Sequence, residues 1–347
     1  MLRYDICFHP DWWHKRAGID FSRVFWENAA YRMEADVLMR KTMFECFGAF
    51  GLGEKDPAPR PLVGSDYTAC GFLLSEMLGC RVVYAPDDAP QVLCAELDDE
   101  QALQLKVPDF DASEPWIRQE EQMRALMKEY GRVECHLNLM GVQNIALDLR
   151  GQELFLDYYD EDSPAENLLN VSYQTMAEAC RRLKRYSPYI SGGVTNVISR
   201  VCPEVTLTSN CTVEMTSLSI YEHFLLKYDC LLAREFAPFG IHHCGQTMEH
   251  VVEGYAKVPN VTFAEVGAFS DLEKVKNALP DTVRLNARFS PVRLGEASPE
   301  EIRAEVADMA RIVPGPRLSI SCAGIDSSVP DEKIFAFLEA CRNALAD

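Results

Sequence analysis

The chain has 347 residues, which is long enough for one large α/β domain or two domains of ordinary size. Hydrophobic residues make up 48% of it and charged residues 25%, the proportions of a globular protein with a large buried core. The net charge of −19 argues against binding to nucleic-acid phosphates or to an anionic membrane surface. Small molecules, metals and partner proteins remain as ligands.

The cysteines and the N-terminal segment indicate a cytoplasmic protein. Thirteen cysteines are scattered without a regular framework, which in a chain of this size predicts reduced thiols rather than a disulfide scaffold. The first residues lack the apolar core of a signal peptide. Since no run approaches the ~18 apolar residues of a membrane span, we expect no transmembrane helix.

Two segments organise the first part of the chain. Residues 20–47 lack proline and glycine and predict a long helix, whereas residues 48–61 are rich in both and predict a linker or long loop. Three tryptophans lie in this part, at Trp12, Trp13 and Trp26. We expect them to pack helices onto the rest of the fold, with lining of a substrate pocket as the alternative.

After residue 61, apolar runs alternate with helical patterns. The expected strands cover 80–84, 133–139, 204–208, 239–243, 261–266, 282–286 and 317–321. The expected helices cover 115–130, 165–186, 217–236, 248–256, 272–278, 298–312 and 330–345. Gly131 is a C-cap signal, and Ser298 followed by Pro-Glu-Glu is an N-terminal helix signal. Seven or eight such units favour a TIM (β/α)8 barrel, with a doubly wound open sheet as the alternative.

In a barrel the chemistry lies at the carboxyl ends of the strands, and a His-x-Cys pair occupies one of these ends. His242 and Cys244 are separated by one residue, so in extended chain both side chains point the same way. Zinc accepts such nitrogen and sulfur ligands, and catalytic zinc keeps one position open. His243 points the other way and is expected to pack or to support the site.

Two further strand ends supply candidate ligands. Cys322 directly follows the strand over 317–321, and Glu265 lies at the end of the strand over 261–266. His242, Cys244, Glu265 and Cys322 could therefore form one metal site. The alternatives are that the cysteines are small core residues and that Glu265 is a solvated loop carboxylate.

Several amides near strand ends suit a neutral or polar substrate. The candidate substrate-binding residues are Asn138, Gln143, Asn196, Asn210 and Asn286. Asn144 and Cys211 lie beside members of this set. For each amide, an ordinary role in a loop or turn is the alternative.

With these residues in view, the chain resembles the uroporphyrinogen decarboxylase superfamily, and within it the zinc-dependent methyltransferases that work with corrinoid proteins. The matching stretches include GIHHCGQT, SIYEHFLLKYDCLL, VRLNARFSPVRLGEASPEEIRAEV and SCAGIDSSVPDEKIFAFLEACR. The His-x-Cys-Gly motif of the family falls on His242, Cys244 and Gly245, and its late cysteine falls on Cys322. Its acidic ligand would fall on Glu265.

The resemblance implies a TIM barrel catalytic domain over residues 61–347 behind an N-terminal helical extension and linker over residues 1–60. It implies Zn2+ held by His242, Cys244, Glu265 and Cys322, with His242, Cys244 and Cys322 as the catalytic set. Cobalamin would be carried by a partner corrinoid protein. Departures are a longer stretch over 285–291 that carries an arginine, and a poor match over the first hundred residues.

The activity implied by this resemblance is methyl transfer between a small substrate and the cobalamin of the corrinoid protein. The substrate would be a methyl donor such as a methoxylated aromatic, as for an O-demethylase, or a thiol acceptor. Some methyl-ether-cleaving relatives use two glutamates and a histidine, a pattern that Glu222 and His243 fit in part. The alternatives are a metal-free lyase of the decarboxylase type and a non-catalytic corrinoid- or tetrapyrrole-binding protein, and a homodimer is left open.

Overall fold

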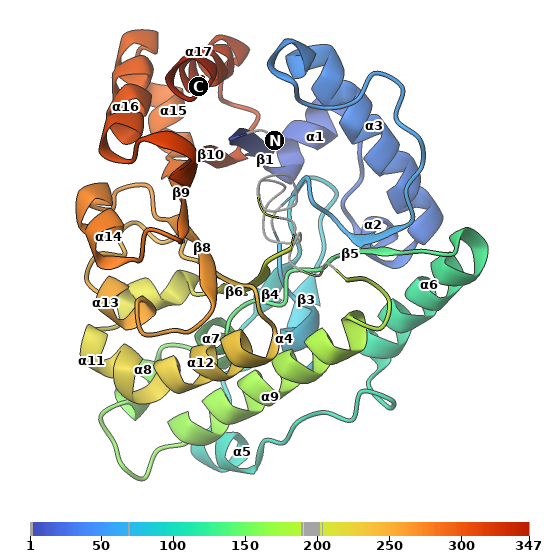
Figure 1. The fold of residues 1–347 in the computed structure, drawn as a ribbon. Coiled ribbons are helices and arrows are strands. Elements are labelled where there is room, and N and C mark those ends of the chain that lie inside the picture. The colour runs from blue at the N-terminus through green and yellow to red at the C-terminus, as the bar shows by residue number, and fades with distance from the viewer. Residues whose placement is uncertain (1–2, 69, 189, 191–201, 203, 347) are drawn as a thin grey trace.

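The structure, a computed structural model, describes residues 3–68, 70–188, 190, 202 and 204–346. Its centre is a curled sheet of six parallel strands (Figure 1). In sheet order these are β1 (Tyr4–Phe8), β10 (Leu318–Ile325), β9 (Arg284–Phe289), β8 (Val261–Val266), β7 (Phe239–His242) and β6 (Thr206–Ser209). The expected α/β class is therefore confirmed. The order holds no reversal of the kind that defines a doubly wound sheet.

Two smaller strand pairs complete the described strands. β2 (Leu62–Gly64) pairs in parallel with β5 (Glu134–His136), and β3 (Arg81–Val83) pairs antiparallel with β4 (Gln91–Leu93). A backbone hydrogen bond of 3.2 Å from the Ser209 amide to the Met140 carbonyl links the end of β6 to the loop after β5. The β2–β5 pair therefore lies beside the β6 edge of the large sheet. The expected strand over 80–84 belongs to the hairpin rather than to the large sheet.

Helices surround the strands on the outside (Figure 1). In the first half they are α1 (Pro10–Ala17), α2 (Arg23–Glu27), α3 (Ala29–Phe47), α4 (Leu73–Met77), α5 (Asp99–Gln104), α6 (Glu114–Tyr130), α7 (Val142–Arg150), α8 (Glu153–Asp157) and α9 (Ala165–Leu183). In the second half they are α11 (Leu218–Ile220), α12 (Leu226–Glu235), α13 (Val252–Tyr255), α14 (Leu272–Ala278), α15 (Pro291–Glu296), α16 (Pro299–Ile312) and α17 (Asp331–Ala344). No helix of the described residues is long and apolar enough to cross a membrane.

Local capping explains why the best-predicted helices begin and end where they do. Ser298 and Glu301 form a capping box at the start of α16, in which each side chain accepts a hydrogen bond from the other residue's backbone amide. Gly131 adopts the left-handed conformation that ends α6. The expected helix over 20–47 is instead two helices, because Asn28 leaves helical geometry and its side chain caps α3.

The N-terminal tryptophans pack, as expected. Trp12 stacks on Phe8 of β1 at 3.8 Å between ring centroids, and Trp13 meets Phe8 edge-on at 5.6 Å. Trp26 is also buried. The sequence pattern does not predict β1, because a charged Asp5 interrupts a five-residue strand. In the structure this carboxylate is fully buried and accepts a hydrogen bond of 2.8 Å from the Ile6 amide.

One face of the large sheet is polar. His242 of β7 lies in register with Glu265 of β8, Glu265 with Asn286 of β9, and Asn286 with Ser319 of β10. Residues in register point to the same face, so this row brings histidine, carboxylate, amide and hydroxyl together on one face of the sheet. His242 and Glu265 lie near the carboxyl ends of their strands, whereas Ser319 lies near the start of β10.

Candidate metal centre

Three potential metal ligands meet at the ends of β6 and β7. Cys211 opens the 3-10 helix η2 (Cys211–Met215) after β6, His242 ends β7, and Cys244 follows two residues later. One ligand atom from each lies within 4.8 Å of the others. The sulfurs of Cys211 and Cys244 are 2.9 Å apart, and both residues are free cysteines. His242 and Cys244 thus converge as the spacing predicts, and Cys211 joins them.

A buried carboxylate fixes the histidine of this cluster. Nδ1 of His242 is hydrogen-bonded to Oε2 of Glu265, which is fully buried. Nη1 of Arg288 lies 3.3 Å from the other carboxylate oxygen. Because Nδ1 is engaged, Nε2 of His242 is the nitrogen left for an ion. A carboxylate on the second nitrogen is the usual support of a metal-binding histidine.

The interactions within the cluster favour the charged forms of Glu265, His242 and Cys244. Burial acts to raise the pKa of Glu265, but the charges of His242 and Arg288 outweigh it and hold that pKa below its usual range. Burial acts to lower the pKa of His242, but Glu265 and Cys244 raise it to about 9. The hydrogen bond with Cys211 and the charge of His242 hold the pKa of Cys244 well below that of a free thiol. A thiolate is thereby favoured at Cys244.

The two sulfurs and the histidine nitrogen of the cluster are ligand types that zinc prefers. A catalytic zinc site takes three nitrogen or sulfur ligands in nearly tetrahedral arrangement and leaves a fourth position open. Cys211, His242 and Cys244 supply these three ligands. A metal would displace the proton between the two sulfurs and the second proton of the His242 imidazolium. The residues therefore fit a zinc ion.

The structure does not bring Cys322 to this cluster. Ser321 lies in register with Arg288, whereas Cys322 lies in register with Phe289 and with Ile6 of β1. Side chains alternate along a strand, so Cys322 points to the face opposite Arg288. Burial raises the pKa of its thiol. Its assignment as a ligand stays a prediction that this geometry does not favour, and Glu265 lies behind His242 rather than among the three ligands.

Gln143 and Asn210, two of the amides expected to bind substrate, form hydrogen bonds around the loop that carries Cys211. Gln143 of α7 donates hydrogen bonds to the Thr212 carbonyl at 2.8 Å and to its hydroxyl at 3.2 Å. Its neighbour Asn144 accepts from the Thr212 hydroxyl at 2.6 Å. Asn210 donates to Asp229 of α12 at 2.7 Å. These contacts fix the residues on either side of Cys211.

The three remaining amides that were expected to bind substrate differ in their surroundings. Asn286 donates to Ser321 at 2.7 Å and accepts from Ser319 at 3.0 Å. Asn138 accepts from the Met140 amide at 2.8 Å and lines a pocket. Asn196 lies outside the described residues. Substrate contact by these amides stays a prediction.

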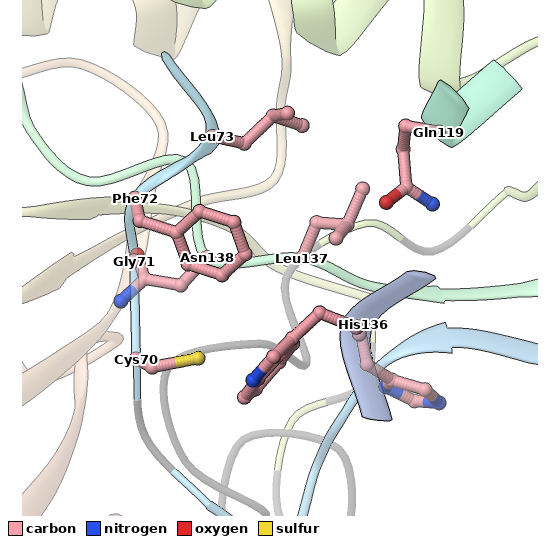
Figure 2. A pocket seen from close by; sticks show the side chains of 10 residues that line it. Cys70, Gly71, Phe72, Leu73, Gln119, His136, Leu137 and Asn138 are labelled. Carbon is pink, nitrogen blue, oxygen red and sulfur yellow. The ribbon is translucent and has the colours of Figure 1, made fainter. Parts of the chain in front are cut away.

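The pocket beside Asn138 lies at the ends of β2 and β5 (Figure 2). Cys70, Gly71, Phe72 and Leu73 follow one another along one wall, and His136 and Leu137 lie across from them. Trp26 and Gln119 also line the pocket, so Trp26 both packs and borders a cavity. Nδ1 of His136 and Nε2 of Gln119 are buried without a hydrogen-bond partner among the described residues, which fits a bound water there.

His243 and Glu222 do not join the cluster. His243 is hydrogen-bonded to the Tyr255 hydroxyl at 2.8 Å and to the Thr247 carbonyl at 2.9 Å, and burial lowers its pKa to about 4. Glu222 forms an ion pair with Lys257 at 2.5 Å. The described geometry therefore gives the two-glutamate pattern no support. His243 is buried and packed, which is one of the two roles expected of it.

Two glycines let the loops around the cluster approach each other. A Cβ atom on Gly141 would lie 2.0 Å from the Ser209 carbonyl oxygen, and one on Gly267 would lie 2.1 Å from the Gly245 carbonyl oxygen. Real Cβ atoms do not approach backbone oxygens so closely, so these positions accept only glycine. The loops after β5, β7 and β8 are held together in this way.

Comparison with known proteins identifies a similar fold but assigns the chain to no family. No family model matches the chain, and no curated protein matches it. A solved structure described as a methyltransferase from Methanosarcina mazei is similar, with a TM-score of 0.61 and 16% sequence identity. The match covers 97% of this chain and 93% of that one. At this identity the likeness shows that the two chains share a fold over nearly their whole length.

Proposed function

We propose that this protein is a zinc-dependent methyltransferase that moves a methyl group between a small substrate and the cobalamin of a partner corrinoid protein. The observation that carries the proposal is the Cys211–His242–Cys244 cluster at the carboxyl ends of parallel strands. Enzymes of this architecture place their chemistry at that end. The likeness to a methyltransferase over nearly the whole chain supports the same reading.

The proposal includes a closed barrel of eight parallel strands. The six-stranded sheet and the β2–β5 pair together supply that number of strands. The hydrogen bond between the Ser209 amide and the Met140 carbonyl supports the junction of β5 with β6. At the other edge, the Trp13 indole on the α1 helix donates to the Tyr67 carbonyl after β2 at 3.3 Å, which supports the approach of β1 and β2.

In the proposed site, zinc would supply Lewis acidity to an oxygen or sulfur of the substrate and so favour the anionic form of that atom. Cys211, His242 and Cys244 would hold the ion. Glu265 keeps the proton of His242 on Nδ1 and fixes the plane of its ring. Gln143 and Asn144 hold Cys211 in place through Thr212.

Exposed apolar side chains around the same end support a protein partner. Met215 follows β6, Phe269 follows β8 and Val292 follows β9, and their exposed fractions are 62%, 58% and 67%. All three follow the carboxyl ends of strands in the large sheet, and we take them as part of a surface for association with a protein. We assign this end to the corrinoid protein, in a cytoplasmic setting that keeps the thiols reduced.

The test is methyl transfer under anaerobic conditions with zinc-loaded protein. Methylcobalamin is mixed with a panel of thiols, and cob(I)alamin with methoxylated aromatics, while the corrinoid absorbance is followed. We expect turnover with one panel, its loss in Cys244→Ser, and its retention in Cys94→Ser, which removes an exposed thiol after the β4 hairpin. Turnover that persists in metal-free protein would contradict the proposal and favour a lyase of the decarboxylase type. Tight corrinoid binding without metal or turnover would favour a binding protein.

A further inference from the structure

Arg288 is a largely buried cation beside the metal cluster, and it donates no hydrogen bond to another residue that the structure describes. It lies on the polar face of β9, and only 13% of its side-chain surface is exposed. Among the described residues its one ion-pair partner is Glu265, at 3.3 Å. A charge-assisted pair made for stability has donor–acceptor distances of about 2.7–2.9 Å and is often bidentate, so this contact leaves most of the guanidinium free.

Other arginines in the interior show how this chain satisfies a guanidinium that serves only the fold. Arg32 donates to three backbone carbonyls and one glutamine side chain, at 2.8–3.1 Å. Arg60 forms hydrogen bonds to two aspartates, and Arg150 to two aspartates and a carbonyl. A guanidinium carries five N–H donors, and the fold satisfies those of these three arginines through several hydrogen bonds each. Arg288 differs from them, because it donates no hydrogen bond to another described residue.

The polar groups nearest Arg288 on its face of the sheet are engaged with one another or with His242. Ser321 lies in register with Arg288, and Asn286 and Ser319 lie one layer below on the same face. Asn286 is hydrogen-bonded to both serines. Glu265 is shared with His242, so its charge already serves the imidazole. Arg288 contacts Glu265, which is hydrogen-bonded to His242, so the guanidinium lies beside the metal cluster.

We infer that Arg288 binds an anionic group of the substrate, a carboxylate, sulfonate or phosphate, while the reacting atom of the same molecule lies at the metal cluster. The planar fork of a guanidinium matches such oxyanions in a bidentate manner. This inference rests on the proposed function for the reacting end of the substrate. It narrows the methyl donor or acceptor to anions and makes Arg288 the residue that sets this specificity.

The test compares two ligands that differ only in charge, 3-mercaptopropionate and 3-mercaptopropionamide, whose dissociation constants are measured by calorimetry. With zinc-loaded protein we expect the carboxylate to bind about tenfold or more tightly than the amide. Arg288→Met should abolish this preference while the affinity for the amide changes little. Arg288→Lys should restore part of it, because the charge returns without the fork.

Two controls keep the result interpretable. Arg293→Met removes a surface arginine that pairs with Glu301 and Glu305, and should leave the preference intact. Circular dichroism and zinc content of Arg288→Met show whether the fold and the cluster survive, and Arg288→Lys is the informative variant if they do not. Zinc-loaded wild type without a preference for the carboxylate overturns the inference and leaves the proposed function standing. A preference lost with Arg288 in a protein that binds no zinc supports the anion site and overturns the proposed function.

Discussion

Asp229 gives the most quantitative prediction, because it is an acid enclosed behind the metal cluster. Its Oδ2 accepts hydrogen bonds of 2.7 Å from both Asn210 and Tyr221. Tyr221 begins a π-helical turn (Tyr221–Leu225), an irregularity that proteins often keep near functional sites. Burial raises the pKa of Asp229 from 3.8 to about 6, although both hydrogen bonds act to lower it.

This shift fixes how the stability of the fold depends on pH. Between pH 4 and 6 the unfolded chain releases the proton of Asp229 while the folded chain retains it, so the free energy of unfolding falls as pH rises. Above this window the enclosed carboxylate costs about 3 kcal/mol. Asp229→Asn keeps an oxygen that can accept from Asn210 and Tyr221 but removes the charge. Its stability relative to wild type should therefore grow by about 2–3 kcal/mol between pH 4 and pH 7.5.

Urea unfolding at pH 4, 5 and 7.5 measures this difference, with Asp56→Asn as the control for removal of an exposed carboxylate. Asp229→Ala leaves both donors unpaired and should be less stable than Asp229→Asn at each pH. A difference between Asp229→Asn and wild type that is the same at pH 4 and pH 7.5 would refute the reasoning. The carboxylate would then be ionised in the fold without cost.

Two other substitutions test how the site is held. Glu265→Gln removes the charge behind His242 and should weaken zinc binding about 10–100-fold in competition with a chromophoric chelator, whereas an unchanged affinity would show that Glu265 does not support the histidine. Gly141→Ala places a Cβ against the Ser209 carbonyl, so the ends of β5 and β6 must separate. We expect a loss of more than about 2 kcal/mol in urea unfolding, and an unchanged midpoint would mean that the loops yield freely.

Much of the helical framework could be predicted from the sequence because its signals are local. Ser298 and Gly131 determine helix ends through contacts within a few residues, and both act as the sequence indicates. The short strands β1 and β2 could not be predicted in this way. Their backbone hydrogen bonds go to β10 and β5, which are distant in the chain, so their apolar pattern is too brief to identify them.

The candidate site shows the same limit in finer detail. His242 and Cys244 could be assigned to one site from the sequence, because two residues separated by one position in an extended chain point in the same direction. Cys211 also follows an expected strand, but nothing local distinguishes it from Cys322 as the third ligand. The distinction depends on which face of the sheet each side chain occupies, and this depends on strand register, which distant pairing decides.

The zinc content of anaerobically purified protein tests the central claim most directly, measured for wild type, Cys211→Ser and Cys322→Ser. The account predicts about one zinc per chain in wild type and in Cys322→Ser, and a loss of zinc in Cys211→Ser. Wild type without zinc after reconstitution would contradict the account, as would a loss of zinc in Cys322→Ser while Cys211→Ser retains it.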